Sequence, residues 1–201
     1  MAEQSSNFAD FLARHRLPES FAKLAHQYYV PLAAWVDERI RYSEPDTFIL
    51  GINGAQGTGK TTLSNFLAEY LRGTRNLSVA ELSIDDIYLT RAERINLAHQ
   101  VHPLLATRGV PGTHDVELGK TVLEKLRRLP PEETMALPRF DKSADDRLPA
   151  GEWPEVTGPV DLVIFEGWCV GSTAQPAADL ETPVNQLEAD EDGDGTWRNY
   201  V

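Results

Sequence analysis

A glycine-rich segment that ends in one lysine and two threonines has the clearest chemical character in the sequence. Residues 51–62 read GINGAQGTGKTT and directly follow a short apolar run. Gly54, four further residues, Gly59, Lys60 and Thr61 fit the pattern G-x-x-x-x-G-K-[ST]. Glycine adopts backbone dihedrals that let several N–H groups curl around one anion. The segment therefore predicts a loop that binds a phosphate chain.

Each part of this loop has an expected role in binding ATP with Mg²⁺. Backbone N–H groups at the positive end of the following helix are expected to surround the α- and β-phosphates. Lys60 is expected to bridge the β- and γ-phosphates, the Thr61 hydroxyl to bind Mg²⁺, and Thr62 to contact the α-phosphate. The predicted nucleotide-binding residues are Gly54, Ala55, Gln56, Gly57, Thr58, Gly59, Lys60, Thr61 and Thr62.

Two carboxylates stand at the ends of other apolar runs. Phosphoryl transfer needs one carboxylate to orient the acceptor hydroxyl and a second acidic group near the metal. Asp85, in SIDDIYL, is the candidate for the first role, and Glu166, in VIFEGW, is the candidate to organise Mg²⁺ or its water. Asp86 is equally compatible with a helix cap or turn. Lys60, Asp85 and Glu166 are thus the predicted catalytic residues, and Thr61, Asp85 and Glu166 the predicted metal site.

The elements that must hold these residues follow an α/β pattern. Continuous apolar runs are typical of parallel strands covered on both faces, and ligands bind beyond the carboxyl ends of such strands. The apolar pattern predicts strands over 47–53, 77–84 and 160–165, and helices over 8–42, 61–71 and from 116 to about 129. We expect an N-terminal helical segment, 1–44, packed on one domain, 45–201. Residues 101–115 and 137–153 are predicted loops that face the substrate.

The composition limits the class of protein and of ligand. Hydrophobic residues make up 41% and charged residues 25% of the 201 residues, which is typical of a globular protein. The net charge of -12 argues against a nucleic-acid or membrane surface, so the expected partner is a small molecule held by a local cluster. Cys169 is the single cysteine, which fits a reducing cytoplasm, and the sequence predicts neither a secretory signal nor a membrane span. The oligomeric state stays open.

The motifs together resemble the P-loop kinases of small metabolites, the group that holds uridine kinase, pantothenate kinase and phosphoribulokinase. Asp85 with Tyr88 matches an acidic and aromatic element after the second strand, and Glu166 with Gly167 matches the end of a later strand. GINGAQGTGKTTL, SIDDIYLT, RGVPGTHD, LPRFDKSADDR and FEGWCVG, spread over residues 47–201, resemble the glycerate 3-kinase family in particular. The resemblance implies a three-layer P-loop NTPase fold with a mainly parallel sheet, and ATP-dependent phosphorylation of D-glycerate.

The acceptor residues follow from this resemblance and from the basic residues of the two loops. Guanidinium groups bind a carboxylate through two parallel hydrogen bonds, so the basic side chains suit a hydroxy acid. Asp115 is compatible with holding a substrate hydroxyl and equally with capping the next helix. His102 and His114 are interpreted as loop or core histidines. The predicted substrate residues are Tyr88, Arg108, Asp115, Arg139, Lys142 and Arg147.

The family pattern also implies a five-stranded core and a mobile lid, whereas this sequence predicts three strands. We therefore expect a chain truncated at its C-terminal end, with the last strands and the lid missing, weak ATP binding and poor turnover. Two alternatives stay open. One is a nucleotide-binding module with little transfer activity, and the other is a kinase of the uridine or pantothenate type.

Overall fold

The computed structural model describes residues 2–43 and 47–201, with side chains for residues 8–42 and 47–201. The expected boundary between residues 44 and 45 lies outside the described residues. Within the described part, no helix combines the length and apolar character that crossing a membrane requires.

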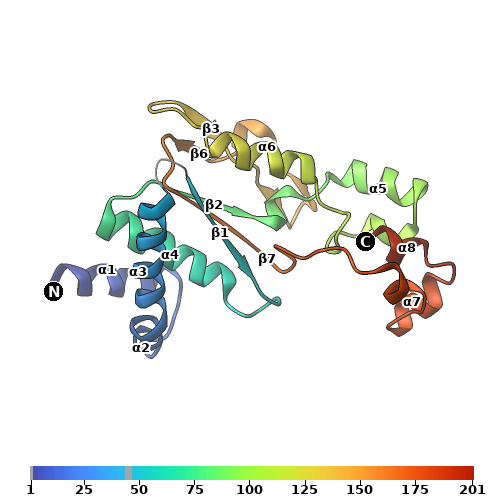
Figure 1. Cartoon of the computed structure of the whole chain (residues 1–201), viewed down its shortest axis with the longest axis horizontal. Coiled ribbons are helices and arrows are strands. Elements are labelled where there is room, and N and C mark those ends of the chain that lie inside the picture. The colour runs from blue at the N-terminus through green and yellow to red at the C-terminus, as the bar shows by residue number, and fades with distance from the viewer. Residues whose placement is uncertain (1, 44–46) are drawn as a thin grey trace.

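A three-stranded parallel sheet forms the centre of the fold (Figure 1). Its strands are β1 (Phe48–Asn53), β2 (Val79–Ser83) and β7 (Leu162–Gly167), in the spatial order β1-β7-β2. The three strands predicted from the apolar runs are therefore confirmed. In the register, Glu166 of β7 lies between Ile52 of β1 and Ser83 of β2. The carboxyl ends of all three strands thus meet at one edge.

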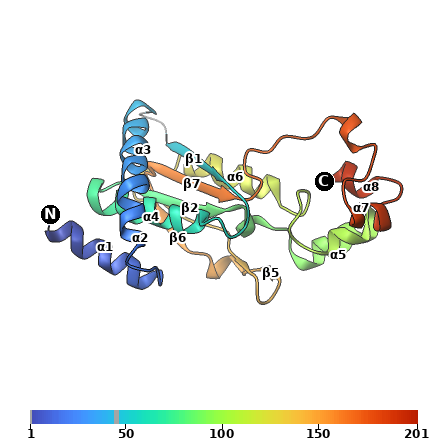
Figure 2. The same ribbon diagram turned by 90° about the horizontal axis from the view of Figure 1, so that it is seen from below.

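Helices cover both faces of this sheet (Figures 1 and 2). The α-helices of the N-terminal half are α1 (Ala2–Arg14), α2 (Phe21–Leu24), α3 (Val30–Ser43), α4 (Lys60–Arg75) and α5 (Arg91–Gln100). Those of the C-terminal half are α6 (Val116–Leu126), α7 (Gln186–Glu191) and α8 (Thr196–Tyr200). Shorter helical turns are η1 (Ala25–Tyr29), η2 (Ile84–Ile87), η3 (Pro103–Ala106), η4 (Ala150–Glu152) and η5 (Ala177–Leu180).

Alternating side chains of β7 divide the core into two clusters. Leu162 and Ile164 pack with residues of α1, α3 and α4 on one face, among them the fully buried Leu67. Val163 packs on the other face with α6, including Leu126. Because β7 is the middle strand, both of its faces are covered, and its run VDLVIF accordingly lacks polar alternation. The predicted three-layer α/β architecture is confirmed.

The N-terminal helical segment departs from the predicted continuous helix. It breaks between α1 and α2, where Arg16 has a positive φ of 53° and Leu17 precedes a proline. A residue before proline is disfavoured in the helical region, which explains the break. After the break, the chain is helical from Phe21 through a π-helical turn into α3. The pattern found the apolar face of this segment and missed the interruption.

Both predicted substrate loops contain more regular structure than expected. The second loop and its neighbours form two small antiparallel ribbons, β3 (Thr134–Ala136) with β6 (Glu155–Thr157) and β4 (Phe140–Asp141) with β5 (Asp146–Arg147).

The segment after β7 ends in α7 and α8, which lie beside α5 in both views (Figures 1 and 2). A ring nitrogen of His102, just after α5, lies 2.9 Å from the Glu191 carbonyl oxygen of α7. This contact joins the C-terminal helices to the first predicted substrate loop.

The end of β7 packs tightly against the turn that carries Asp85. A Cβ atom on Gly167 would lie 2.3 Å from Cγ2 of Ile84, the first residue of η2. We expect Gly167→Ala to lower the free energy of unfolding by ~1–3 kcal/mol, because strand and turn must separate. Urea denaturation measures this, with Gly151→Ala as the control, since a Cβ there meets no atom within 4 Å. Equal transition midpoints for the two variants would contradict the close packing.

Candidate active site

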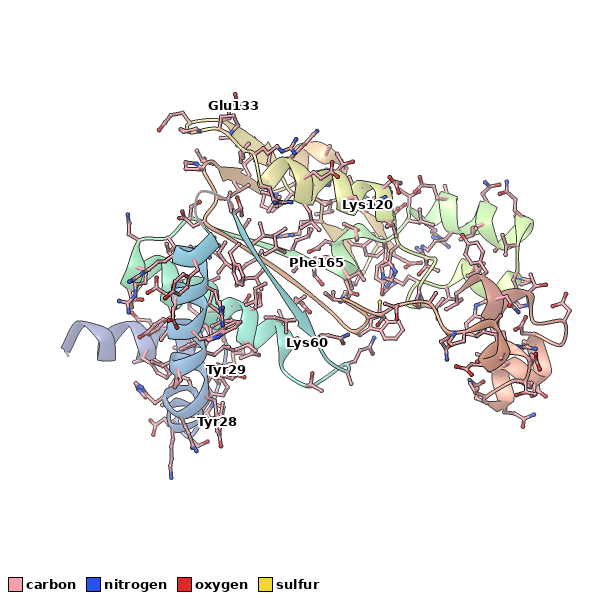
Figure 3. All side chains as sticks on the ribbon, viewed as in Figure 1. Tyr28, Tyr29, Lys60, Lys120, Glu133 and Phe165 are labelled. Atoms are coloured by element: carbon pink, nitrogen blue, oxygen red, sulfur yellow. The ribbon has the colours of Figure 1, made fainter. Side chains whose placement is uncertain are left out.

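The phosphate loop lies between β1 and α4, at the carboxyl edge of the sheet (Figure 3). Gly57 and Gly59 have positive φ values of 78° and 88°, which side-chain-bearing residues rarely adopt. Lys60 then opens α4, and no side chain of the described chain caps this helix at Gly59. A helix start leaves backbone N–H groups without intrahelical partners, so an uncapped start is a site for an anion. The geometry fits the predicted phosphate loop.

Lys60 is bound to the loop itself. Its Nζ donates a hydrogen bond of 2.9 Å to the carbonyl oxygen of Ala55. The hydroxyl of Thr58 donates to the same oxygen at 2.7 Å. The Thr58 backbone N–H donates to it as well, at 3.3 Å, so three donors on one carbonyl hold the loop in a closed shape.

Glu166 and Thr61 meet behind this loop. Glu166 is only 8% exposed, and its Oε1 accepts a hydrogen bond of 3.0 Å from the Thr61 hydroxyl. A hydroxyl and a carboxylate are the hard oxygen donors that Mg²⁺ prefers, usually completed by waters and substrate phosphates. The described residues contain no cluster of three or more acidic, histidine or cysteine side chains that could hold a metal by themselves. Thr61 and Glu166 thus fit a magnesium ion that is bound together with a nucleotide.

The structure separates the two aspartates that follow β2. Asp86 is the more buried, and it accepts hydrogen bonds from the Ser83 backbone N–H at 3.1 Å and from Arg139 at 2.9 Å. Burial raises the pKa of Asp86, although Arg139 opposes the change. The Asp85 carboxylate instead pairs with the exposed Lys142 ammonium at 2.6 Å. Asp86 therefore caps the turn, while Asp85 is the carboxylate that a substrate can approach.

Tyr88 is a buried ring at the base of the site. It stacks on His114 with a centroid distance of 4.4 Å and meets Phe140 edge-on at 5.4 Å. Burial raises the pKa of Tyr88, and the Asp85 carboxylate adds to this effect. Tyr88 therefore stays protonated and packs beside Asp85. Its contact with the substrate, expected from the sequence, stays a prediction.

His114 is a buried histidine that we expect to make the stability of the fold depend on pH. It is 7% exposed, its Nε2 has no hydrogen-bond partner among the described residues, and burial lowers its pKa to about 4 from the ordinary 6.5. The folded chain resists protonation of this ring, so its contribution is present above pH 6.5 and is lost as the pH falls towards 4. We expect ~3 kcal/mol of unfolding free energy to be lost from this group.

Urea denaturation between pH 7 and pH 4 measures this loss. His114→Phe should keep the aromatic packing and remove this part of the pH dependence. His99→Phe, at an exposed position on α5, should retain it. If the His114→Phe variant loses as much stability as the unmodified chain, another group is responsible.

The predicted acceptor residues come together around the loop of β4 and β5, in two sets. Lys142 pairs with Asp85, and Arg108 pairs with Asp145. Arg139 instead bonds Asp86, which caps the turn after β2, and the Arg147 guanidinium donates to the Tyr88 carbonyl at 2.7 Å.

Asp115 has the capping role that the sequence left open. Its carboxylate accepts a hydrogen bond of 2.9 Å from the Leu118 backbone N–H at the start of α6, and Arg147 binds its second oxygen at 3.2 Å. Among the predicted cations, Lys142 has the most exposed side chain, and Arg108 lines a cavity beside the phosphate loop.

A cavity of about 630 Å³ opens beside the phosphate loop. Ala55 and Gln56 of the loop form one wall, and Arg108 with its neighbours forms another. Trp168 follows β7 and donates an indole hydrogen bond of 2.9 Å to the Gly109 carbonyl, which fixes that wall. The volume lies within the range of small-molecule sites, and the wall combines apolar surface with few polar groups. Of the predicted substrate residues, Arg108 lines this cavity, whereas Asp85 and the other five do not. The position beside the phosphate loop and the Arg108 guanidinium make the cavity the candidate acceptor site.

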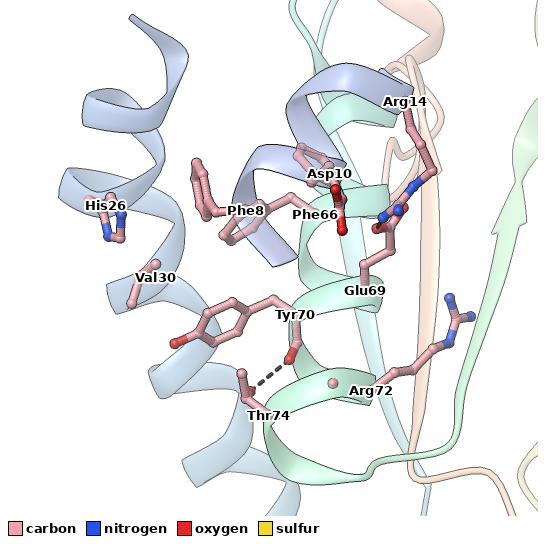
Figure 4. A pocket seen from close by; sticks show the side chains of 12 residues that line it. Phe8, Asp10, Arg14, His26, Val30, Phe66, Glu69, Tyr70, Arg72 and Thr74 are labelled. Carbon is pink, nitrogen blue, oxygen red and sulfur yellow. Dashed lines mark hydrogen bonds and ion pairs between the residues drawn. The ribbon is translucent and has the colours of Figure 1, made fainter. Parts of the chain in front are cut away.

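A second cavity, of about 440 Å³, lies between the N-terminal helices and the far end of α4 (Figure 4). Aromatic rings form much of its wall, with Phe8 stacked on His26 at a centroid distance of 4.9 Å. Among the charged residues of its wall, Arg14 and Glu69 bind each other. This cavity is separate from the residues predicted to do chemistry.

Three residues that bear on the site were not predicted from the sequence: Trp168, Asp145, which pairs with Arg108, and Arg94, which bonds the Asp145 carbonyl. Arg94 stands in the polar helix segment RAERIN, where an arginine normally faces solvent. Asp145 stands among other charged residues of a predicted loop. Only Trp168, directly after the E-G pair, carried a usable signal, because a large aromatic residue beyond a buried strand end often lines a ligand site.

Comparison with known proteins gives a consistent picture. The chain is 36% identical over 182 residues to the chloroplastic D-glycerate 3-kinase of Arabidopsis thaliana. This match covers 83% of this chain and 40% of that protein. The chain is 42% identical over 131 residues to an uncharacterized kinase of Schizosaccharomyces pombe, over 62% of this chain and 47% of that protein. The chain thus spans less than half the length of these two relatives. No family model matches it.

Solved structures agree with these relatives. The D-glycerate 3-kinase of Cryptococcus neoformans superposes with a TM-score of 0.67 at 33% identity, over 76% of this chain and 56% of that one. These matches confirm the prediction from the motifs: the chain has the fold of a P-loop kinase and is similar in sequence and structure to the D-glycerate 3-kinases.

Proposed function

We propose that this chain is an ATP-dependent kinase that transfers the γ-phosphoryl group of ATP to a hydroxyl group of D-glycerate. The observation that carries the proposal is the meeting of three groups at one sheet edge. These are the uncapped start of α4, the Thr61–Glu166 pair and the Asp85 carboxylate. The similarity to two proteins named D-glycerate 3-kinase supports the choice of acceptor.

The residues of the loop bind and orient the nucleotide in this proposal. The phosphate chain takes the N–H groups at the start of α4, and Lys60 exchanges the Ala55 carbonyl for phosphate oxygens. Thr61 and Glu166 hold Mg²⁺, which supplies positive charge to the phosphate oxygens when bound. The chain itself contributes the fixed direction of these donors.

Asp85 acts on the acceptor hydroxyl. A carboxylate within hydrogen-bond reach of that hydroxyl orients it and accepts its proton as the new P–O bond forms, while the bond from the γ-phosphorus to the bridging oxygen breaks and ADP leaves. Lys142 lies 2.6 Å from one oxygen of Asp85, and the carboxylate has a second oxygen that can accept from the acceptor hydroxyl. In this proposal the ammonium group of Lys142, together with Arg108 at the cavity wall, pairs with the acceptor carboxylate.

An ADP-release assay with Mg-ATP tests the proposal on three acceptors: D-glycerate, uridine and pantothenate. We expect D-glycerate to stimulate release at least about tenfold more than the other two. Uridine has no carboxylate for Arg108 to pair with, and the relatives that support the proposal over pantothenate are named D-glycerate 3-kinases. Greater stimulation by uridine or pantothenate would assign a different acceptor. Nucleotide binding without stimulation by any of the three would favour a nucleotide-binding module.

A further inference from the structure

Arg94 of α5 is a fully buried arginine, with 0% of its surface exposed. Its guanidinium donates hydrogen bonds to three backbone carbonyls: Leu89 at 3.2 Å, Ala106 at 3.0 Å and Asp145 at 2.7 Å. Burying a charge is costly unless its hydrogen bonds are made, and here the partners come from three separate segments of the chain. Arg94 therefore joins α5 to both predicted substrate loops.

Asp145 links Arg94 to a second arginine. Its carboxylate lies 3.1 Å from the Arg94 guanidinium, and the same oxygen accepts a hydrogen bond from Arg108. Asp145 has a positive φ of 54°, an uncommon backbone conformation for a residue with a side chain. This conformation lets both its carbonyl and its carboxylate meet Arg94. Burial works against ionisation, but hydrogen bonds from Arg94 and Arg108 hold the pKa of Asp145 below its usual range.

Arg108 stands where this chain of contacts reaches the acceptor cavity. It lines the cavity, as does Gln56 of the phosphate loop. The Phe140 ring lies beneath both guanidinium groups, with centroid distances of 5.9 Å to Arg94 and 5.5 Å to Arg108. The direction of the Arg108 guanidinium thus depends on a carboxylate and a ring that Arg94 holds in place.

We propose that Arg94 is a positioning residue that, through the shared carboxylate of Asp145, fixes the direction of Arg108 at the acceptor cavity. The inference deepens the proposed function and rests on it, since Arg108 is there the partner of the acceptor carboxylate. Bidentate binding of a carboxylate requires a guanidinium plane with a defined orientation, and a fixed plane binds with a smaller loss of side-chain entropy. Arg94 supplies that orientation without touching the acceptor.

A double-mutant cycle of Arg94→Lys and Arg108→Ala tests this coupling. Arg94→Lys keeps the positive charge and loses the planar set of guanidinium donors that bonds the three carbonyls. We therefore expect the KM for D-glycerate to rise about tenfold, with the KM for ATP unchanged within about twofold. In the Arg108→Ala background, Arg94→Lys should change the KM for D-glycerate less than about twofold. The same tenfold rise in both backgrounds, or none in either, would overturn the proposal.

Arg72→Lys is the matched control. Arg72 likewise donates to a backbone carbonyl, that of Val79 at 2.6 Å, and pairs with a carboxylate, that of Glu81 at 3.1 Å. It lies outside the acceptor cavity, so its replacement should leave both KM values unchanged. Asp145→Asn removes the shared charge while Arg94 stays in place, and should reproduce the higher KM for D-glycerate. Asp145→Asn thus carries the test if Arg94→Lys fails to fold.

Hydrogen exchange separates failure of this inference from failure of the proposed function. In Arg94→Lys or Asp145→Asn, amides of residues 104–109 and 140–147 should exchange at least about tenfold faster, while α4 stays protected. If D-glycerate is not phosphorylated by the unmodified chain, the proposed function fails, and the exchange result still decides whether Arg94 orders these loops. Unchanged exchange in both variants would overturn the positioning role in either case.

Discussion

Replacing Asp85 by asparagine is expected to lower kcat for D-glycerate phosphorylation by a factor of about 10² to 10⁴, the range that a general base contributes. Asparagine keeps the size of the side chain, but its neutral amide lacks the basic carboxylate that accepts the proton. Binding of ATP should stay within about twofold, because the phosphate loop lies on another strand–helix connection. The ADP-release assay measures kcat, and titration with a fluorescent nucleotide measures binding.

Asp86→Asn is the matched control for this variant. Asp86 neighbours Asp85 in the chain, but its carboxylate is bound to the Ser83 N–H and to Arg139. Its replacement should lower the unfolding free energy by ~1–3 kcal/mol, through loss of hydrogen bonds to a charged group, and leave kcat within about fivefold. A normal kcat in Asp85→Asn, or an equal loss in the two variants, would remove Asp85 from its role.

Replacing Lys60 by methionine is the second change with a large expected effect. Methionine has similar length and no charge, so the β- and γ-phosphates lose the one ammonium group of the loop. Removing one member of a close charge pair costs ~2–5 kcal/mol, and we therefore expect ATP affinity to fall by a factor of about 30 or more. Calorimetric titration with Mg-ATP measures the affinity directly.

Lys120→Met provides the comparison for Lys60. Lys120 is an exposed lysine on α6 that pairs with Glu117 at 2.9 Å. Figure 3 shows it well apart in space from Lys60. Its removal should leave ATP affinity unchanged, because exposed charges at such distances are screened by salt. If both lysine variants bind ATP as the unmodified chain does, the loop is not the nucleotide site.

The sheet and the site edge were predictable because their signals are local. Three apolar runs, each followed by glycine or acidic residues, predicted strands whose ends meet, and the structure brings Asn53, Ser83 and Glu166 to one edge. The loop pattern likewise placed Lys60 and Thr61 at the start of a helix. Parallel strands buried on both faces leave a distinctive sequence pattern, whereas their spatial order does not appear in that pattern.

Contacts between distant residues could not be predicted in this way. Arg94 bonds the carbonyl of Asp145, 51 residues further along the chain, and nothing in RAERIN distinguishes a buried arginine from a solvated one. The ribbon of β4 and β5 has two residues in each strand, too few for an alternating pattern. Asp115 shows the opposite case, because capping is a local role, and the sequence had offered it alongside substrate binding.

The bond between Lys60 and its own loop has a consequence for the choice among anions. An arriving ligand has to offer the ammonium group more than the Ala55 carbonyl already does. Anionic phosphate oxygens do offer more, because a hydrogen bond between two ionised groups is about twice as strong as one to a neutral carbonyl. The internal bond therefore acts as a threshold that favours ligands with negative charge over neutral ones.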